Sequence, residues 1–322
     1  MSGDLVPFAV NSAEWRAGAT DVQDRRHRGV SVGPVRDIEP TPERTTVRWL
    51  NDGGVRIGSL VRVGAVATDS AIRAAYRGLS AAAGGLATPQ IRAVATVGGA
   101  LAQRSRCWYF RQPLFNCFKK GGQSCPAREG DHRLGVLIDL GPCVWPHPST
   151  LGVALMAYDA VVDTSRGRRL TMAELFGDGS MAVSDHLLEA DELIEAITMP
   201  PPSAGERAGY LRGIARHAAE WPLVEVVIRL WVSDDVIKDV VVAAGAVANV
   251  PIRLTSAETV LRGCAVNQVR ARLEDVTLSG THLEATSYKQ PLLRGCLAAV
   301  AAQALEPEPA VPVDGLALEW RL

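Results

Sequence analysis

The chain has 322 residues, of which 47% are hydrophobic and 21% are charged, and its formal net charge at pH 7 is -1. This length suits two domains with separate cores, and the balanced charge gives no reason to expect nucleic acid as a partner. No apolar run reaches the ~20 residues that a membrane-spanning helix needs, so membrane insertion is not expected.

The first residues, MSGDLVPFAV, lack a basic region followed by an apolar core, so they do not predict a secretory signal. Cytoplasm is therefore the default expectation for the protein's location. Six cysteines in a chain of this length do not indicate a small disulfide-stapled fold. Clustered cysteines in an intracellular protein more often bind metal.

Residues 46–69 predict a β-hairpin that leads towards a helix. TVRWL and VRIGSLVRVG alternate apolar and polar side chains on either side of an Asn-Asp-Gly-Gly turn at 51–54. An Ala-rich helix is expected over 69–86, capped by Thr68 or Asp69. The stretch 87–99 that follows is expected to be a loop.

The second half of the chain alternates helical and extended patterns. Residues 151–162 predict a helix followed by a strand, ELIEAITM predicts a strand, and the Pro-rich stretch 200–206 predicts a linker. Beyond the linker we expect the order helix, strand, strand, helix. These patterns together predict an α+β chain of two domains.

Four cysteines, Cys107, Cys117, Cys125 and Cys143, follow one another at the spacing C-x9-C-x7-C-x17-C. This spacing differs from the C-x2-C pairs of zinc ribbons and bacterial ferredoxins. Four thiolates are the usual ligand set of a cubane iron–sulfur cluster, although the residues alone leave a structural zinc or unrelated buried thiols open. The two cysteines nearer the C-terminus are expected to be ordinary core residues.

Two glycine turns, at 16–21 and 96–100, could bring backbone N–H groups close to a phosphate. Neither turn matches the G-x-G-x-x-G or G-x-x-x-x-G-K pattern, and either could simply be a structural turn. His147, between two prolines, could be a ligand, a base or a packed side chain. No catalytic triad or carboxylate pair is evident, which fits electron transfer by a bound cofactor.

These segments together resemble the FAD-binding (medium) subunit of the xanthine dehydrogenase family of molybdenum hydroxylases. AGATD at 17–21 is similar to the family's AGGTD turn, and ATPQIRAVATVGGAL is similar to its A-S-x-Q-I-R-N-x-A-T-V-G-G-N-L segment. The resemblance implies an α+β fold with a two-part FAD-binding domain of the PCMH (vanillyl-alcohol oxidase-like) type over 1–202, which includes a cysteine-rich loop at 104–150. It further implies a smaller α/β domain of the CO dehydrogenase flavoprotein type over 203–310 and an extended tail over 311–322.

The stretches QRSRCWYFR and CVWPHPS are similar to one branch of that family, which includes periplasmic aldehyde oxidoreductases and, with a differently spaced insertion, 4-hydroxybenzoyl-CoA reductase. FAD subunits of this branch carry an additional [4Fe-4S] cluster. The resemblance therefore implies that the cluster ligands are Cys107, Cys117, Cys125 and Cys143. It implies no catalytic residue in this chain, and it assigns FAD contacts to Ala17, Gly18, Ala19, Thr20, Asp21, Thr96, Val97, Gly98, Gly99, Ala100, His147, Ser149, Thr150, Asp159, Ile194 and Arg212.

The implied assembly is a heterotrimer in which a large subunit with a molybdenum cofactor oxidises the substrate and a [2Fe-2S] small subunit carries the electrons onward. This chain would pass them to FAD and then to an external acceptor. Such complexes can be exported by co-export with a partner subunit, which makes the periplasm an alternative location.

The sequence departs from the family pattern at three positions around the FAD site. Ala19 replaces a glycine, Ala100 replaces an asparagine, and Thr150 stands where an aspartate is usual. The N-terminus is also shorter than that of a typical member, which predicts a reduced adenine-side part. Two alternatives stay open: a scaffold subunit that has lost FAD, and a free-standing flavoprotein with a structural zinc.

Overall fold

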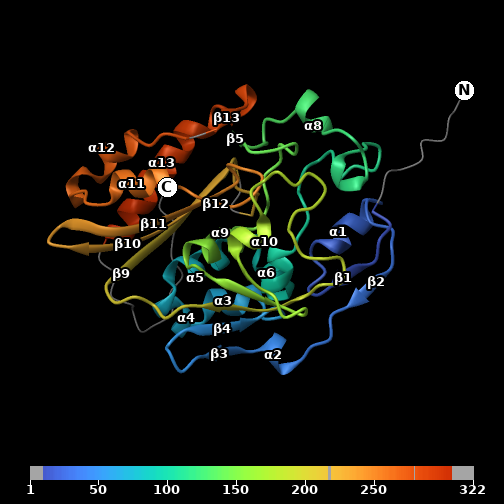
Figure 1. The fold of residues 1–322 in the computed structure, drawn as a ribbon, viewed down its shortest axis with the longest axis horizontal. Helices are drawn as coiled ribbons and strands as arrows, with labels where there is room; N and C mark the ends of the chain where they lie inside the picture. Colours follow the sequence, from blue (N-terminus) through green and yellow to red (C-terminus); the bar gives the residue numbers. More distant parts are fainter. Residues whose placement is uncertain (1–9, 217–218, 279, 307–322) are drawn as a thin grey trace, which may run out of the picture.

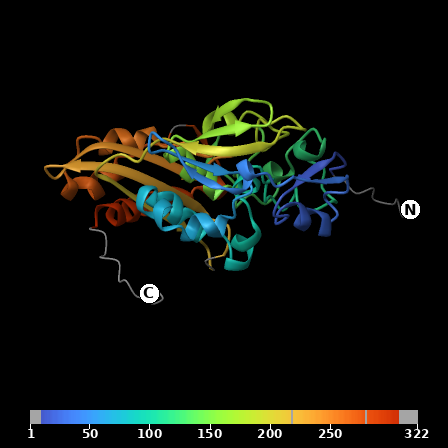
Figure 2. The same ribbon diagram turned by 90° about the horizontal axis from the view of Figure 1, so that it is seen from below.

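The computed structural model describes residues 10–216, 219–278 and 280–306. Within this part the chain is α+β, as expected, with a five-stranded and a four-stranded sheet and helices packed around both (Figure 1). Viewed from below, the molecule is elongated, with the N-terminal unit at one end and the four-stranded sheet at the other (Figure 2). No helix in the described residues is long and apolar enough to span a bilayer. The expected tail at 311–322 lies outside them.

The five-stranded sheet is antiparallel throughout and has the order β3-β4-β8-β6-β7. Its strands are β3 (Val47–Trp49), β4 (Val55–Gly58), β6 (Val161–Thr164), β7 (Arg169–Thr171) and β8 (Ile194–Met199). The expected hairpin is confirmed as β3 and β4, and the expected strand at ELIEAITM is β8, the middle strand of the sheet. The short helix α2 (Pro42–Thr45) precedes β3.

A run of short helices follows the hairpin: α3 (Val63–Thr68), α4 (Ser70–Ala75), α5 (Arg77–Gly85), α6 (Pro89–Val94) and α7 (Val97–Leu101). The expected cap is confirmed, since the Asp69 carboxylate accepts a hydrogen bond from the N–H of Ile72 at 2.9 Å. The single helix expected over 69–86 is interrupted at Tyr76, whose backbone is non-helical.

The expectation of a loop over 87–99 was wrong, because α6 and α7 occupy most of it. The side chains of Thr88 and Thr96 each cap one of these helices, and Pro89 takes the first position of α6, where its missing N–H costs no hydrogen bond. The helices are too short to show an apolar period in the sequence.

The four-stranded sheet has the order β12-β11-β10-β9 and is also antiparallel. Its strands are β9 (Glu206–Gly213), β10 (Val224–Ser233), β11 (Val236–Gly245) and β12 (Ile252–Arg253). The helices α11 (Thr255–Leu261), α12 (Val269–Glu274) and α13 (Lys289–Leu305) share a core with it, and α5 and α9 (Thr150–Ala157) also pack on it. We expected a helix directly after the Pro-rich stretch, but β9 stands there, because it pairs along its length with β10.

The N-terminal unit contains β1 (Glu14–Arg16), α1 (Val22–His27) and β2 (Val35–Asp37), with β1 and β2 parallel. The cysteine segment lies beside this unit and has little regular structure (Figure 1). It contains a 3-10 turn at Phe118–Lys120, the helix α8 (Pro126–Glu129) and the strand β5 (Ile138–Asp139), which pairs with β13 (Thr281–His282). The remaining elements of the described residues are the helix α10 (Met172–Phe176) and two 3-10 turns, Val266–Gln268 and Glu284–Thr286.

Candidate cofactor sites

The two glycine turns border one cavity of about 400 Å³. One turn connects β1 to α1, and the other forms the start of α7. The strand β8 contributes the third side of the cavity through its first residue. The residues expected to hold FAD that line it are Ala17, Gly18, Ala19, Thr20, Asp21, Thr96, Gly98, Gly99 and Ile194.

Glycine is required in both turns because the backbone packs tightly there. A Cβ atom on Gly18 would overlap the carbonyl oxygen of Val94, and one on Gly98 would lie 2.8 Å from the Cβ of Ser59. Ala19, by contrast, has a φ of 62°, in the left-handed region that glycine adopts most easily. The structure therefore retains the backbone shape of a glycine turn at a position where the sequence has alanine.

Seven of the expected FAD residues do not line this cavity. Val97 and Ala100 are buried in the main core around α7. At the start of α9, the Ser149 hydroxyl accepts a hydrogen bond from the N–H of Gly152 at 3.0 Å, and His147 Nδ1 accepts one from the N–H of Ser149 at 3.2 Å. Burial lowers the pKa of His147 to about 3, so this ring is neutral.

The other three expected residues make contacts elsewhere. Thr150 lies beside the buried side chains of Tyr210 and Glu225, where the Tyr210 hydroxyl donates to Glu225 at 3.1 Å. Asp159 lies 3.2 Å from Arg253 and borders a different cavity, of about 500 Å³. Arg212 donates to the backbone carbonyls of Gly85 and Glu220.

Two buried polar atoms in the cavity lining were not singled out by the sequence. Ser59 Oγ and Glu192 Oε1 have no hydrogen-bond partner, and both residues line the cavity. His186 also lines it, and burial lowers the pKa of its ring to about 4. The sequence pattern predicted a strand through Ser59, but β4 ends at the residue before it. Its position just after a strand was therefore the only sequence signal for a functional role.

All four clustered cysteines border a second, small cavity with about 20 Å³ of free volume. Cys107, Cys117 and Cys143 are buried and Cys125 is half-buried, and Phe110, Phe118 and Trp145 line the same space. Burial raises the pKa of the Cys107 and Cys117 thiols, and it raises that of Cys143 to about 11. Among the described residues, no three His, Cys, Asp or Glu side chains lie close enough to hold a single metal ion.

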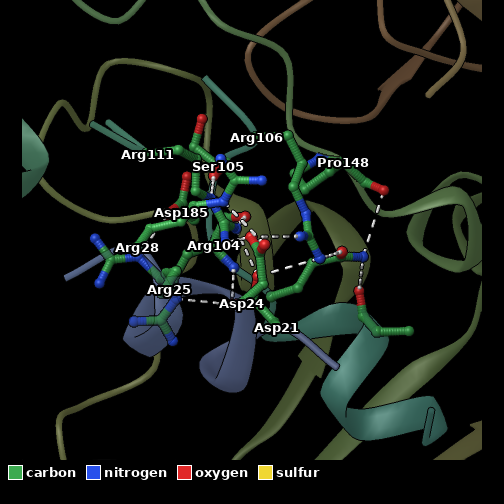
Figure 3. Close-up of polar contacts among 12 residues, drawn as sticks. Asp21, Asp24, Arg25, Arg28, Arg104, Ser105, Arg106, Arg111, Pro148 and Asp185 are labelled. Atoms are coloured by element: carbon green, nitrogen blue, oxygen red, sulfur yellow. Dashed lines mark hydrogen bonds and ion pairs between the residues drawn. The ribbon is translucent and has the colours of Figure 1, made fainter. Parts of the chain in front are cut away.

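A network of ion pairs, part of which Figure 3 shows, joins residues that line the larger cavity, such as Asp21 and Arg104, to residues that line the smaller one, such as Lys119. Asp21 lies 2.5 Å from Arg111, 3.1 Å from Arg106 and 3.1 Å from Arg25. Burial acts to raise the pKa of Asp21, but the arginines Arg111, Arg106 and Arg25 lower it to about 2. The carboxylate is therefore charged, and it binds arginines instead of capping α1.

A second carboxylate makes a similar connection. Asp185 lies 2.6 Å from Arg104 and 2.8 Å from Lys119. Against the effect of burial, Lys119 and Arg104 hold the pKa of Asp185 well below its usual range. Its neighbours Ser184 and His186 line the larger cavity.

Comparisons with known proteins agree with this architecture. The FAD binding domain in molybdopterin dehydrogenase matches residues 9–202, and the CO dehydrogenase flavoprotein C-terminal domain matches residues 210–295. PaoB of Escherichia coli (strain K12), an aldehyde oxidoreductase FAD-binding subunit, is 32% identical to this chain over 260 residues, which are 78% of this chain and 79% of that protein.

Solved structures with the same fold include carbon monoxide dehydrogenase from Hydrogenophaga pseudoflava, in a form that lacks the Mo-pyranopterin moiety of the molybdenum cofactor. Its TM-score is 0.67 at 19% identity, and the match covers 91% of this chain and 89% of the dehydrogenase chain. Quinoline 2-oxidoreductase from Pseudomonas putida 86 has a TM-score of 0.66 at 16% identity, with the same shares covered. The chain therefore belongs to the family of FAD-binding domains of molybdopterin dehydrogenases, which are oxidoreductases, and it carries the C-terminal domain of the CO dehydrogenase flavoproteins.

Proposed function

We propose that this chain is the FAD- and [4Fe-4S]-carrying electron-transfer subunit of a molybdenum hydroxylase complex that oxidises an aldehyde or a related substrate. In that role a large subunit with a molybdenum cofactor passes electrons to a [2Fe-2S] small subunit. This chain receives the electrons from the small subunit and delivers them to an external acceptor. The observation that carries the proposal is the pair of neighbouring cavities, one bordered by glycine turns and one by four thiols. The likeness to the FAD-binding subunit PaoB supports the aldehyde class.

The larger cavity fits FAD by its chemistry. Gly18, Gly98 and Gly99 leave backbone free to approach a pyrophosphate. The unpartnered Ser59 Oγ can donate to, or accept from, a polar group of the cofactor, and Glu192 Oε1 can accept a hydroxyl or amino proton. A buried polar atom without a partner costs about 1–3 kcal/mol, so a ligand that satisfies both atoms gains affinity.

The smaller cavity fits an iron–sulfur cluster by its donor set of four cysteines. A single zinc ion would need the four sulfurs about 2.3 Å from one centre, and among the described residues no three such side chains lie close enough to hold one ion. A free volume of about 20 Å³ holds little more than one water, so the surrounding loops must widen to admit a cluster. The irregular backbone of the segment allows such a change more easily than helices or strands would.

In this proposal FAD and the cluster supply the electron exchange, and the protein supplies their binding and surroundings. Phe110, Phe118 and Trp145 keep water from the thiols. Burial raises the pKa of the Cys117 thiol overall, and the backbone N–H of Lys119 and the charges of Lys120 and Lys119 offset part of that rise.

The cofactor content of the purified full-length protein tests the proposal. We expect flavin absorbance together with a broad brown shoulder, and about four irons per chain in metal analysis. Iron without flavin would instead indicate a scaffold that has lost FAD. Flavin with zinc and no iron would overturn the cluster assignment.

A further inference from the structure

We infer that the two cofactor sites are energetically coupled, so that a filled four-cysteine site strengthens FAD binding and bound FAD strengthens iron retention. This inference rests on the proposed function and adds to it a dependence of each site on the other. The inference rests on the ion pairs of Asp21, Asp24 and Asp185 with cations near Cys107 and Cys117. Figure 3 shows the part of this network around Asp21, Asp24 and Arg111.

The first connection runs from the FAD turn to the residues around Cys107. Arg111 contacts Asp21 at 2.5 Å and Asp24 at 2.9 Å, and its side chain is only 5% exposed. The same guanidinium donates to the backbone carbonyls of Arg104 and Ser105 at 2.9 and 2.8 Å. One side chain therefore fixes the wall of the larger cavity and the approach to Cys107 at once.

Arg106 strengthens this connection. It precedes Cys107 directly, lies 3.1 Å from Asp21, and stacks on Trp221 with its guanidinium carbon 4.5 Å from the ring centroid. Trp221 lies just before β10, so Arg106 connects the FAD turn and the cysteine segment to the stretch that leads into this strand.

The second connection runs from Ser184 and His186, which line the larger cavity, to the residues around Cys117. Asp185 pairs with Lys119 at 2.8 Å, and Lys119 Nζ also donates to the carbonyl of Ser184 at 2.8 Å. Asp185 also pairs with the side chain of Arg104 at 2.6 Å. The backbone N–H of Arg104 donates to the Asp21 carboxylate at 3.1 Å. The two carboxylates, Asp21 and Asp185, are thus joined through a single residue.

These connections are the reason to expect coupling. The cysteine segment has few regular elements, so its order depends on what holds its side chains. Iron bound to the four cysteines would fix Arg111 and Lys119. These would fix Asp21, which lines the FAD cavity, and Asp185, whose neighbours Ser184 and His186 line it. Because equilibrium coupling is reciprocal, FAD must then stabilise bound iron by the same factor.

The test compares FAD binding to the iron-loaded and the chelator-stripped full-length protein under anaerobic conditions, by titration calorimetry. We expect the Kd for FAD to be about 5–150-fold lower in the iron-loaded protein, which is the usual range of coupling between two sites. Asp24 does not line the cavity. In the variants Asp24→Asn and Arg111→Lys, the ratio of the Kd of the stripped protein to that of the iron-loaded protein should fall towards one. Iron release should likewise be slower with FAD present in the wild type.

The matched control is Arg28→Gln. Arg28 pairs with the same Asp24 at 2.9 Å, but its side chain is 55% exposed and its ion pair does not extend to the cysteine segment. This variant should keep the wild-type ratio. Equal Kd values for FAD in the two forms of the wild type would overturn the coupling, as would an unchanged ratio in both Asp24→Asn and Arg111→Lys. A wild type that takes up no FAD or no iron would overturn the proposed function itself.

Discussion

Gly18 packs directly against the carbonyl oxygen of Val94, so that the turn before α1 touches the end of α6. Val94 lies two residues before the second glycine turn, and residues of both turns line the larger cavity. Because the opposing atom belongs to the backbone, it cannot move aside as the tip of a flexible side chain could.

Replacing Gly18 with alanine should therefore push the first glycine turn away from the end of α6. We expect Gly18→Ala to destabilise the protein by about 1–3 kcal/mol, the usual cost of overpacking, and to reduce bound FAD. Urea unfolding and the flavin content of the purified protein measure the two effects. Gly295→Ala is the matched control, since nothing lies within 4 Å of a Cβ at this exposed position in α13, and alanine should be neutral or stabilising there. Wild-type stability and flavin content in Gly18→Ala would contradict the close contact.

Ala19 should respond in the opposite direction. Its φ of 62° is unfavourable for a residue with a Cβ atom, so Ala19→Gly removes strain of about 1–2 kcal/mol, less the gain in entropy of the unfolded chain. We expect a net rise in the free energy of unfolding and no loss of FAD. The neighbouring Ala17→Gly, whose φ is not positive, should lower the free energy of unfolding. An equal loss in both variants would show that Ala19 is not strained.

The glycine turns and the cysteines could be found from the sequence because each is a local pattern of unusual residue types. The contacts of Asp21 could not, since Asp21 and Arg111 are 90 positions apart and many other arginines would fit the same description. Ser59 and Glu192 were missed for a related reason. Their importance comes from buried atoms that lack partners, a property of the packed structure that residue type does not indicate.

The roles of His147 and Asp159 stay predictions. The resemblance assigned both to FAD, and in the structure the ring of His147 packs on Phe176 with 4.6 Å between centroids, while Asp159 pairs with Arg253. These contacts depend on residues far along the chain, so the sequence could not indicate them.

The cysteine assignment predicts the effect of one substitution on iron content. In Cys117→Ser the remaining thiols cannot complete a four-ligand site, so we expect most of the iron to be lost while the protein stays soluble. Cys264→Ser is the control, because Cys264 is buried in the core of the C-terminal domain, away from the small cavity. Iron analysis of both purified variants measures the effect. Full iron content in Cys117→Ser would show that Cys117 is not a ligand.

Lys289, the first residue of α13, predicts a dependence of stability on pH. Its side chain is fully buried, and Nζ donates to the carbonyl of Ala246 at 2.9 Å and to that of Leu134, in the cysteine segment, at 3.4 Å. Burial lowers the pKa of Lys289 to about 7. In the unfolded chain the pKa of a lysine is about 10.4, so between these values the unfolded state binds more protons than the folded state.

The free energy of unfolding should consequently rise with pH through this window, because stability increases with pH wherever the unfolded state holds the extra proton. The limiting slope for one such group is about 1.4 kcal/mol per pH unit. We expect the stability of the wild type relative to Lys289→Met to increase between pH 7 and pH 9.5, measured by urea unfolding at both values. Lys238→Met, which changes a half-exposed lysine on β11, should show no such increase. If the difference between the wild type and Lys289→Met were the same at both pH values, Lys289 would have to be charged in the folded protein, and the two carbonyls would be holding an ammonium group.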